Sequence, residues 1–291
     1  MDYQKEFLEM KKKEKLYKVL FTISVILLVI SVFLCLITSF SLVALLLSIC
    51  LFSISCALKF GNKSKFKEKI IPLIINDKEL EFICSSDAMN AIVCKSEIIR
   101  DKISNKIRTN DIITGFYQNI YFRSFDCSVY KHKIINIFNK DHLNKNKIFK
   151  GRFYQIRSSL NIKNRVIFYE LNSILEKPSY KEMKTNNVEF DSKFLMFNKY
   201  EDTSIFTDEF YKAILDIEKN DISEIAISFI NNSIYVSINN NIDSFEFEHM
   251  ESINEVSNTY SRDLEIVYSV YEASKKIINK NIEDNKKDAF N

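Results

Sequence analysis

The longest pattern along the chain is a run of 40 residues without a charged side chain, from Val19 to Leu58. A helix rises about 1.5 Å per residue, so roughly 20 apolar residues cross a hydrocarbon core of about 30 Å. One helix of this length would be about twice too long for a bilayer, and tilting does not absorb such an excess. The run therefore predicts a transmembrane helical hairpin with helices over 19–37 and 42–58, joined by the small and polar turn Thr38–Ser41.

The residues on both sides of this run predict its orientation. Five lysines lie just before it, between Lys11 and Lys18, and five lie just after it, between Lys59 and Lys69, whereas the turn between the helices carries no charge. Lysine-rich flanks stay in the cytoplasm. We therefore expect a two-pass protein of the cell membrane with both termini cytoplasmic: a basic N-terminus (1–18), the hairpin (19–58), a basic juxtamembrane segment (59–71), a cytoplasmic domain (72–282) and a frayed tail (283–291).

Beyond residue 71 the apolar pattern alternates between helical and strand periodicity. Pro72 interrupts a helical segment over 66–75, and isoleucines at helical spacing predict a second helix over 91–107. Stretches rich in Ile, Tyr and Phe predict strands. These strands cover 112–125, 129–138, 148–156 and 165–171. Their spacing predicts an antiparallel meander.

The last third of the chain gives the clearest local signals. Thr207 is the expected N-cap of a helix whose first turn is acidic. The pair Asn231-Asn232 predicts a two-residue hairpin turn between strands over 225–230 and 233–238, because Asn tolerates positive φ. Phe245 and Phe247 suggest a third strand, and an amphipathic helix is expected over 253–282. The predicted class is α+β, with a mostly antiparallel sheet, flanking helices and a long C-terminal helix.

The charge is unevenly divided along the chain. Residues 1–71 hold 11 lysines and five acidic residues, although the whole chain has a net charge of only +3. The excess lies where anionic lipid headgroups would meet it. The lysines expected to contact headgroups are Lys11, Lys12, Lys13, Lys63, Lys65 and Lys67. The remainder of the chain is slightly acidic, so nucleic acid is not an expected partner.

The sequence holds no catalytic, cofactor-binding or metal-ligating motif that can be assigned to residues. Phosphate-cradling loops need several glycines, and beyond residue 71 only Gly115 and Gly151 occur. The histidines are too far apart for a common zinc motif, no CxxC pair occurs, and no GxSxG elbow is present. We interpret both glycines as a bulge or tight backbone turn, with close approach of a ligand or partner as the alternative. The aromatic residues between Phe116 and Phe125 are expected in the sheet core rather than as a stacking platform.

Three stretches, in this order, resemble segments of one family of bacterial membrane proteins, the domain of unknown function 3137 family. Asn110–Gly115 resembles its acidic residue followed by Gly before a strand, Phe149–Tyr154 its F-x-G-x-F-F pattern, and Phe190–Phe197 its F-x-x-x-F-x-V segment. The twin N-terminal apolar segments agree, so the resemblance covers roughly residues 15–275. This chain departs from the family in lacking a Tyr/Pro-rich segment after the first helix. The family has no established activity, so the resemblance implies the architecture and no residue roles.

Three functional hypotheses remain open from the sequence. The first is a membrane-anchored cytoplasmic binding or scaffold module that recruits a protein partner or senses the inner leaflet. The second is a hydrolase-like enzyme at the membrane surface, which a deep pocket with converging polar side chains would favour. The third is a subunit of a larger membrane complex, which an unburied apolar stripe on the final helix would favour.

Overall fold

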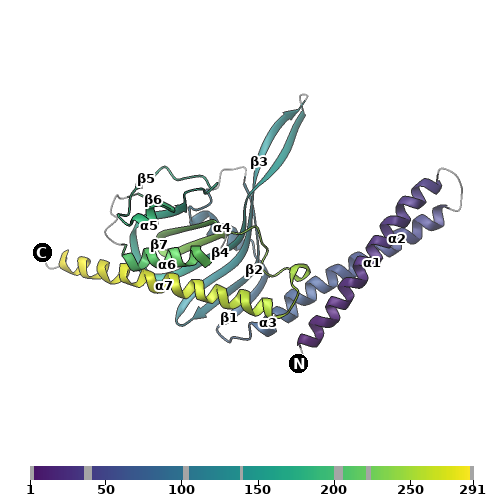
Figure 1. The fold of residues 1–291 in the computed structure, drawn as a ribbon, viewed down its shortest axis with the longest axis horizontal. Coiled ribbons are helices and arrows are strands. Elements are labelled where there is room, and N and C mark those ends of the chain that lie inside the picture. Colours follow the sequence, from purple (N-terminus) through teal and green to yellow (C-terminus); the bar gives the residue numbers. More distant parts are fainter. Residues whose placement is uncertain are drawn as a thin grey trace. The chain divides into compact units, whose positions relative to one another are not determined.

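The computed structural model describes residues 3–35, 41–100, 105–137, 140–199, 206–220 and 224–288. The chain divides into two compact units. The helical unit comprises residues 1–76 and 245–257, and the sheet unit comprises residues 77–244 and 258–291. Each unit has its own architecture, shown in Figure 1.

Two long antiparallel helices, α1 (Tyr3–Cys35) and α2 (Ser41–Lys65), form most of the helical unit. The two helices pack along a common seam, where the ring centroids of Phe21 and Phe52 lie 5.5 Å apart. Farther along the seam, toward the Lys65 end of α2, Ser55 Oγ donates to the carbonyl of Tyr17 at 3.0 Å. Both helices are long and apolar enough to cross a membrane, as the sequence predicts. Most of the predicted turn lies outside the described residues, at positions 36–40.

The helical unit is completed by two separate parts of the chain. After α2 come a π-helical turn, η1 (Phe66–Ile70), and α3 (Ile71–Ile74), which has Pro72 in its first turn. The other part holds the 3₁₀ turn η2 (Phe247–His249). The prediction of a third strand through Phe245 and Phe247 is therefore wrong. The ring of Phe247 instead packs 5.5 Å from that of Phe7 and 5.2 Å from that of Phe66, and burial of these rings outweighs strand propensity.

The sheet unit is built on one antiparallel sheet, which has seven strands within the described residues. The strands are β1 (Leu80–Ser85), β2 (Asn105–Tyr117), β3 (Ile120–Ile137), β4 (Lys140–Glu170), β5 (Lys181–Met183), β6 (Phe194–Asn198) and β7 (Glu224–Asn239). Their order is β1-β2-β3-β4-β6-β5, and β7 also pairs with β4. The helices are α4 (Ala88–Lys95), α5 (Val188–Asp191), α6 (Asp208–Asn220) and α7 (Asn254–Asp288). This arrangement confirms the α+β class with an antiparallel sheet and a long C-terminal helix, which continues six residues past its expected end.

Helices cover both faces of the sheet (Figure 1). On one face, Val93 of α4 shares a buried cluster with Phe125 and Phe153. On the other face, the ring of Phe168 lies 5.8 Å from that of Phe210 in α6. Neighbouring side chains of a strand point to opposite faces, so Phe153 and Phe168 bury opposite sides of β4. The core is therefore two apolar layers with the sheet between them.

Two predicted elements differ from the structure. The helix expected over 91–107 ends at Lys95, and β2 begins at Asn105. The helical spacing of isoleucines that predicted this helix includes Ile107, which lies in β2. The spacing therefore does not reflect a helix over the whole range. The strand expected over 112–125 is a hairpin, because Gln118 and Asn119 both have positive φ and turn the chain between β2 and β3.

The chain reverses at Asn231-Asn232, as predicted. Asn231 has a φ of +54°. Ser237 Oγ donates to the carbonyl of Ala226 at 3.4 Å, and Asn239 Nδ2 donates to Glu224 Oε2 at 2.8 Å. Both contacts join positions that a two-residue turn would place opposite each other. The two halves of β7 also pair with different parts of β4, residues 233–238 with 152–157 and residues 226–229 with 166–169.

Candidate functional site

The two glycines singled out in the sequence both accommodate the chain's own backbone. A Cβ on Gly115 would lie 2.0 Å from the carbonyl oxygen of Glu79, and the φ of Gly115 is +145°. A Cβ on Gly151 would lie 2.0 Å from the carbonyl oxygen of Ile238. The bulge lies elsewhere, at Asp111, where the register of β2 and β3 shifts and φ is +52°. Both glycines therefore permit close packing of neighbouring backbone.

The other residues considered in the sequence do not converge on one place. Phe122 and Phe125 are fully buried, as predicted, whereas Phe116 is 50% exposed and packs against Tyr121. Cys127 is buried, and burial raises the pKa of its thiol well above the usual range. The side chains of His132 and His142 lie outside the described residues. A reactive thiol is not supported at Cys127, because a buried neutral thiol is inert.

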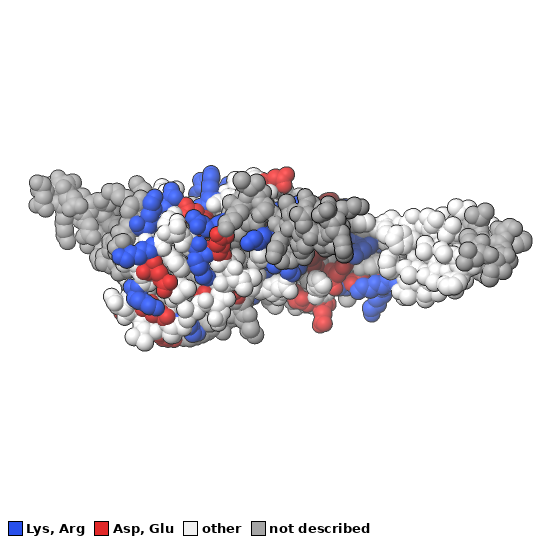
Figure 2. Space-filling view, turned by 90° about the horizontal axis from the view of Figure 1, so that it is seen from above, with Lys and Arg blue, Asp and Glu red and all other residues white. Residues whose placement is uncertain are grey.

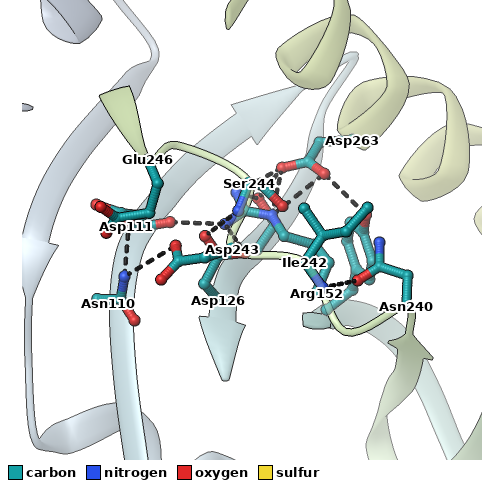
Figure 3. A network of polar contacts seen from close by, with 12 residues as sticks. Asn110, Asp111, Asp126, Arg152, Asn240, Ile242, Asp243, Ser244, Glu246 and Asp263 are labelled. Carbon is teal, nitrogen blue, oxygen red and sulfur yellow. Dashed lines mark hydrogen bonds and ion pairs between the residues drawn. The ribbon is translucent and has the colours of Figure 1, made fainter. Parts of the chain in front are cut away.

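The main polar cluster of the sheet unit surrounds Arg152 of β4 and was not identified from the sequence. Its guanidinium binds Asp263 of α7, with Nη2 at 2.6 Å and Nε at 2.9 Å from Oδ2 (Figure 3). Nη1 donates to the carbonyl of Asp111 at 2.8 Å. Asp263 also accepts from Ser124 Oγ at 2.7 Å and from Tyr154 Oη at 2.8 Å. We call this set, with the acidic residues described next, the Arg152 network.

Further aspartates extend the network toward the loop after β7 (Figure 3). In Asp126 of β3, Oδ1 lies 3.4 Å from Arg152 Nη1, and Oδ2 accepts a hydrogen bond from the backbone N–H of Ser244 at 2.8 Å. Asn110 Nδ2 donates to Asp111 Oδ2 at 2.7 Å and lies 3.4 Å from Asp243 Oδ1. Three strands, one loop and α7 are thereby joined through side chains.

The buried ionisable groups of the network have pKa shifts with different causes. Burial raises the pKa of Asp126 well above its ordinary value, Arg152 opposes that rise, and Asp243 and Asp111 add to it. The pKa of Arg152 lies above its usual range despite burial, because Asp263 and Asp126 favour the charged guanidinium. Burial and Asp263 likewise raise the pKa of Tyr154. Arg152 is therefore held in its charged form, and Asp126 is held toward its neutral form.

Two of the family-like segments converge on this network. Asn110 and Asp111 come from the first segment, and Arg152 and Tyr154 come from the second. The alternation of the second segment explains its roles, since Phe153 points into the apolar cluster while Arg152 and Tyr154 point to α7. The sequence signal that could have revealed the network is Arg152 itself, a charged residue between the aromatic residues of a predicted strand. An arginine buried in a strand needs an acidic or polar partner.

The network holds several elements of the sheet unit together around a buried ion pair. Side-chain exposure is 3% for both Arg152 and Asp263. The contacts of Arg152 described above are all to groups of the chain itself. A bidentate arginine–carboxylate pair fixes both distance and orientation. The arrangement therefore positions α7 and residues 243–244 of the loop after β7 on the sheet.

Fold and site together define an α+β protein with a pair of membrane-length helices and a sheet unit locked by a buried arginine. Residues 147–276, from β4 into α7, match the family described as "Protein of unknown function (DUF3137)". This match confirms the resemblance to that family over these residues. The first family-like segment, Asn110–Gly115, precedes the matched residues.

The other comparisons add little to this assignment. No curated protein matches the chain. Among solved structures, the chain is similar to the mycobacterial trehalose monomycolate transport factor A, TtfA, at 6% identity and a TM-score of 0.36. That similarity covers 71% of this chain and 96% of the other.

Proposed function

We propose that this protein is a membrane-anchored cytoplasmic binding module, whose sheet unit recruits a protein partner at the inner leaflet. The observation that carries the proposal is the pair of antiparallel, membrane-length helices with lysines at both ends. Figure 2 shows the described apolar part of these helices as a surface without charged side chains, with basic and acidic side chains next to it on one side. Two helices without ionisable residues in the apolar run suit an anchor better than a transport path.

The sheet unit also offers a surface of the kind that proteins recognise. A groove of about 620 Å³ runs between α6 and α7. Apolar Ile217 and Ile266 line it beside charged Asp216, Arg262 and Glu265. Mixed apolar and charged linings are typical of non-obligate interfaces. The buried Arg152 network fixes α7, so one wall of the groove is held in place by the sheet.

The test is co-purification of the full-length tagged chain after gentle extraction from its native membrane. We expect a stoichiometric protein partner that is absent when residues 1–76 alone are fused to a fluorescent protein. Ala213→Arg places a long charged side chain into the α6–α7 groove and should release that partner, whereas Lys212→Ala on the exposed side of α6 should retain it. Full-length chain that purifies alone contradicts the binding-module proposal.

A further inference from the structure

A second groove lies in the helical unit, along the seam of α1 and α2. Its volume is about 780 Å³. The groove is lined by aromatic and charged residues, namely Lys18, Phe21, Lys59, Phe60, Lys63 and Glu248. Its walls therefore combine exposed aromatic rings with ammonium groups.

The groove crosses the boundary of the uncharged run. Lys18 and Lys59 are the residues that directly flank that run, and Phe21 lies within it. Because Tyr17 contacts Ser55 across the seam, Lys18 and Lys59 lie about 7.5 Å apart along the helix axes, which is about one and a half helical turns. One end of the groove is therefore apolar and the other is basic, in the order in which a bilayer presents acyl chains and headgroups.

The residues that line the basic end include more lysines than carboxylates. Three lysines line the groove against one carboxylate, Glu248, whose Oε1 lies 3.0 Å from Lys59 Nζ. Lys18 Nζ lies 2.6 Å from Glu14 Oε1. The side chains of Lys18 and Lys59 remain 60% and 46% exposed. An ammonium carries three N–H donors, and each of these two contacts engages one of them.

Other lysines of the helical unit also form ion pairs. Lys63 and Lys67 share Glu246, at 2.8 Å and 3.1 Å, and Lys11 binds Glu14 at 2.7 Å. Lys65 lies 3.5 Å from Glu6. These ion pairs stabilise the unit internally. Among the lysines expected to meet headgroups, Lys12 and Lys13 are exposed to solvent.

We propose that the α1–α2 groove is a binding site for one anionic phospholipid of the inner leaflet. Its phosphate accepts hydrogen bonds from Lys18 and Lys59, and an acyl chain lies along Phe21. This proposal rests on the membrane anchoring proposed above, and adds a defined lipid to it. A zwitterionic lipid fits less well, because its own cation would meet the lysines.

The experiment uses the full-length chain in detergent micelles, with native mass spectrometry to count retained lipids. Phosphatidylglycerol and phosphatidylcholine with identical acyl chains are offered in equal amounts. We expect one phosphatidylglycerol to be retained with roughly tenfold preference, as two phosphate-facing lysines would give. The double variant Lys18→Gln/Lys59→Gln should lose this preference, and Lys18→Arg/Lys59→Arg should keep it, because arginine retains the charge and the donors.

A matched control removes the same charge elsewhere. Lys12→Gln/Lys13→Gln changes two exposed lysines outside the groove and should bind as the unmodified chain does. If the Lys12/Lys13 glutamine variant loses as much lipid preference as the Lys18/Lys59 glutamine variant, the preference comes from overall positive charge, and the proposed site is wrong. Equal retention of the two lipids by the unmodified chain would also overturn the site. Alkaline extraction of membranes separates the two proposals: release of the chain refutes anchoring, whereas an integral chain without lipid preference refutes only the groove.

Discussion

Arg152 and Asp263 form a buried bidentate ion pair between β4 and α7, with Nη2 bound to Oδ2 and Nε to Oδ1, although they are 111 positions apart in the chain. Ser124 and Tyr154 donate to the same carboxylate, so its oxygens are satisfied from two further positions. Burial of an ion pair repays desolvation only with such additional hydrogen bonds. The pair is therefore a specific attachment point for α7.

Removing one member of this pair should be strongly destabilising. Asp263→Ala leaves the guanidinium of Arg152 buried and largely uncompensated, which costs about 3–5 kcal/mol in the free energy of unfolding. Denaturant unfolding of the full-length chain in detergent measures this loss. Lys212→Ala, an exposed substitution on α6, should stay within about 0.5 kcal/mol of the unmodified chain. A loss below about 1 kcal/mol for Asp263→Ala would show that the pair does not hold α7.

Stability should also depend on pH through Asp126. Burial, opposed by Arg152 and supported by Asp243 and Asp111, raises the pKa of Asp126 above its unfolded value. The folded chain therefore keeps a proton that the unfolded chain releases above a pH of about 4. The stabilising contribution is full below that pH and is lost as the pH rises toward the raised pKa. Asp126→Asn cannot ionise, so the difference in unfolding free energy between the two chains should change across this window; a constant difference would contradict the prediction.

The three glycines of the chain should respond differently to alanine. Gly151→Ala and Gly115→Ala place a Cβ 2.0 Å from a backbone carbonyl oxygen, at Ile238 and Glu79 respectively. Backbone cannot move aside easily, so each should lower stability by about 1–3 kcal/mol or more. Gly61→Ala is the control, because nothing lies within 4 Å of its Cβ and alanine favours the helix. Thermal unfolding that ranks Gly61→Ala with the other two would refute the packing argument.

The turn at Asn231 should accept glycine and reject branched residues. Its φ of +54° is accessible to Gly and Asn and costs a β-branched residue about 1–2 kcal/mol. We expect Asn231→Gly to unfold near the unmodified chain and Asn231→Val to unfold at lower temperature. Equal melting of the two variants would mean that the chain does not reverse at this residue.

Both ends of the chain should lie on the same, cytoplasmic side of the membrane. Lysines flank both ends of the apolar run, and the positive-inside rule then keeps both flanks inside. Epitope tags at either terminus should bind antibody only after the cells are permeabilised. A tag that is accessible in intact cells would exclude the two-crossing topology with cytoplasmic termini.

Local signals predicted the parts of the fold that local physics decides. Thr207 caps α6, with its Oγ1 accepting from Phe210 N at 3.3 Å, and Asn231 turns the chain where expected. The uncharged run likewise gave two membrane-length helices. In each case the deciding interactions lie within a few residues of the signal.

Tertiary contacts decided the rest. Phe247 has strand propensity, yet it forms a 3₁₀ turn because its ring meets Phe7 and Phe66 from distant parts of the chain. The Arg152 network was missed for the same reason. Nothing near Arg152 in the sequence points to Asp263, and 38 acidic residues make any pairing by inspection arbitrary.

The cluster of Phe7, Phe66 and Phe247 has a consequence for synthesis of the protein. Two of its rings belong to the first quarter of the chain, and the third is translated about 180 residues after Phe66. A nascent chain can insert its apolar helices early, but the base of the hairpin stays incomplete, with aromatic surface exposed, until Phe247 has been translated. Chains that end before Phe247 therefore leave the rings of Phe7 and Phe66 without this partner at the base of the hairpin.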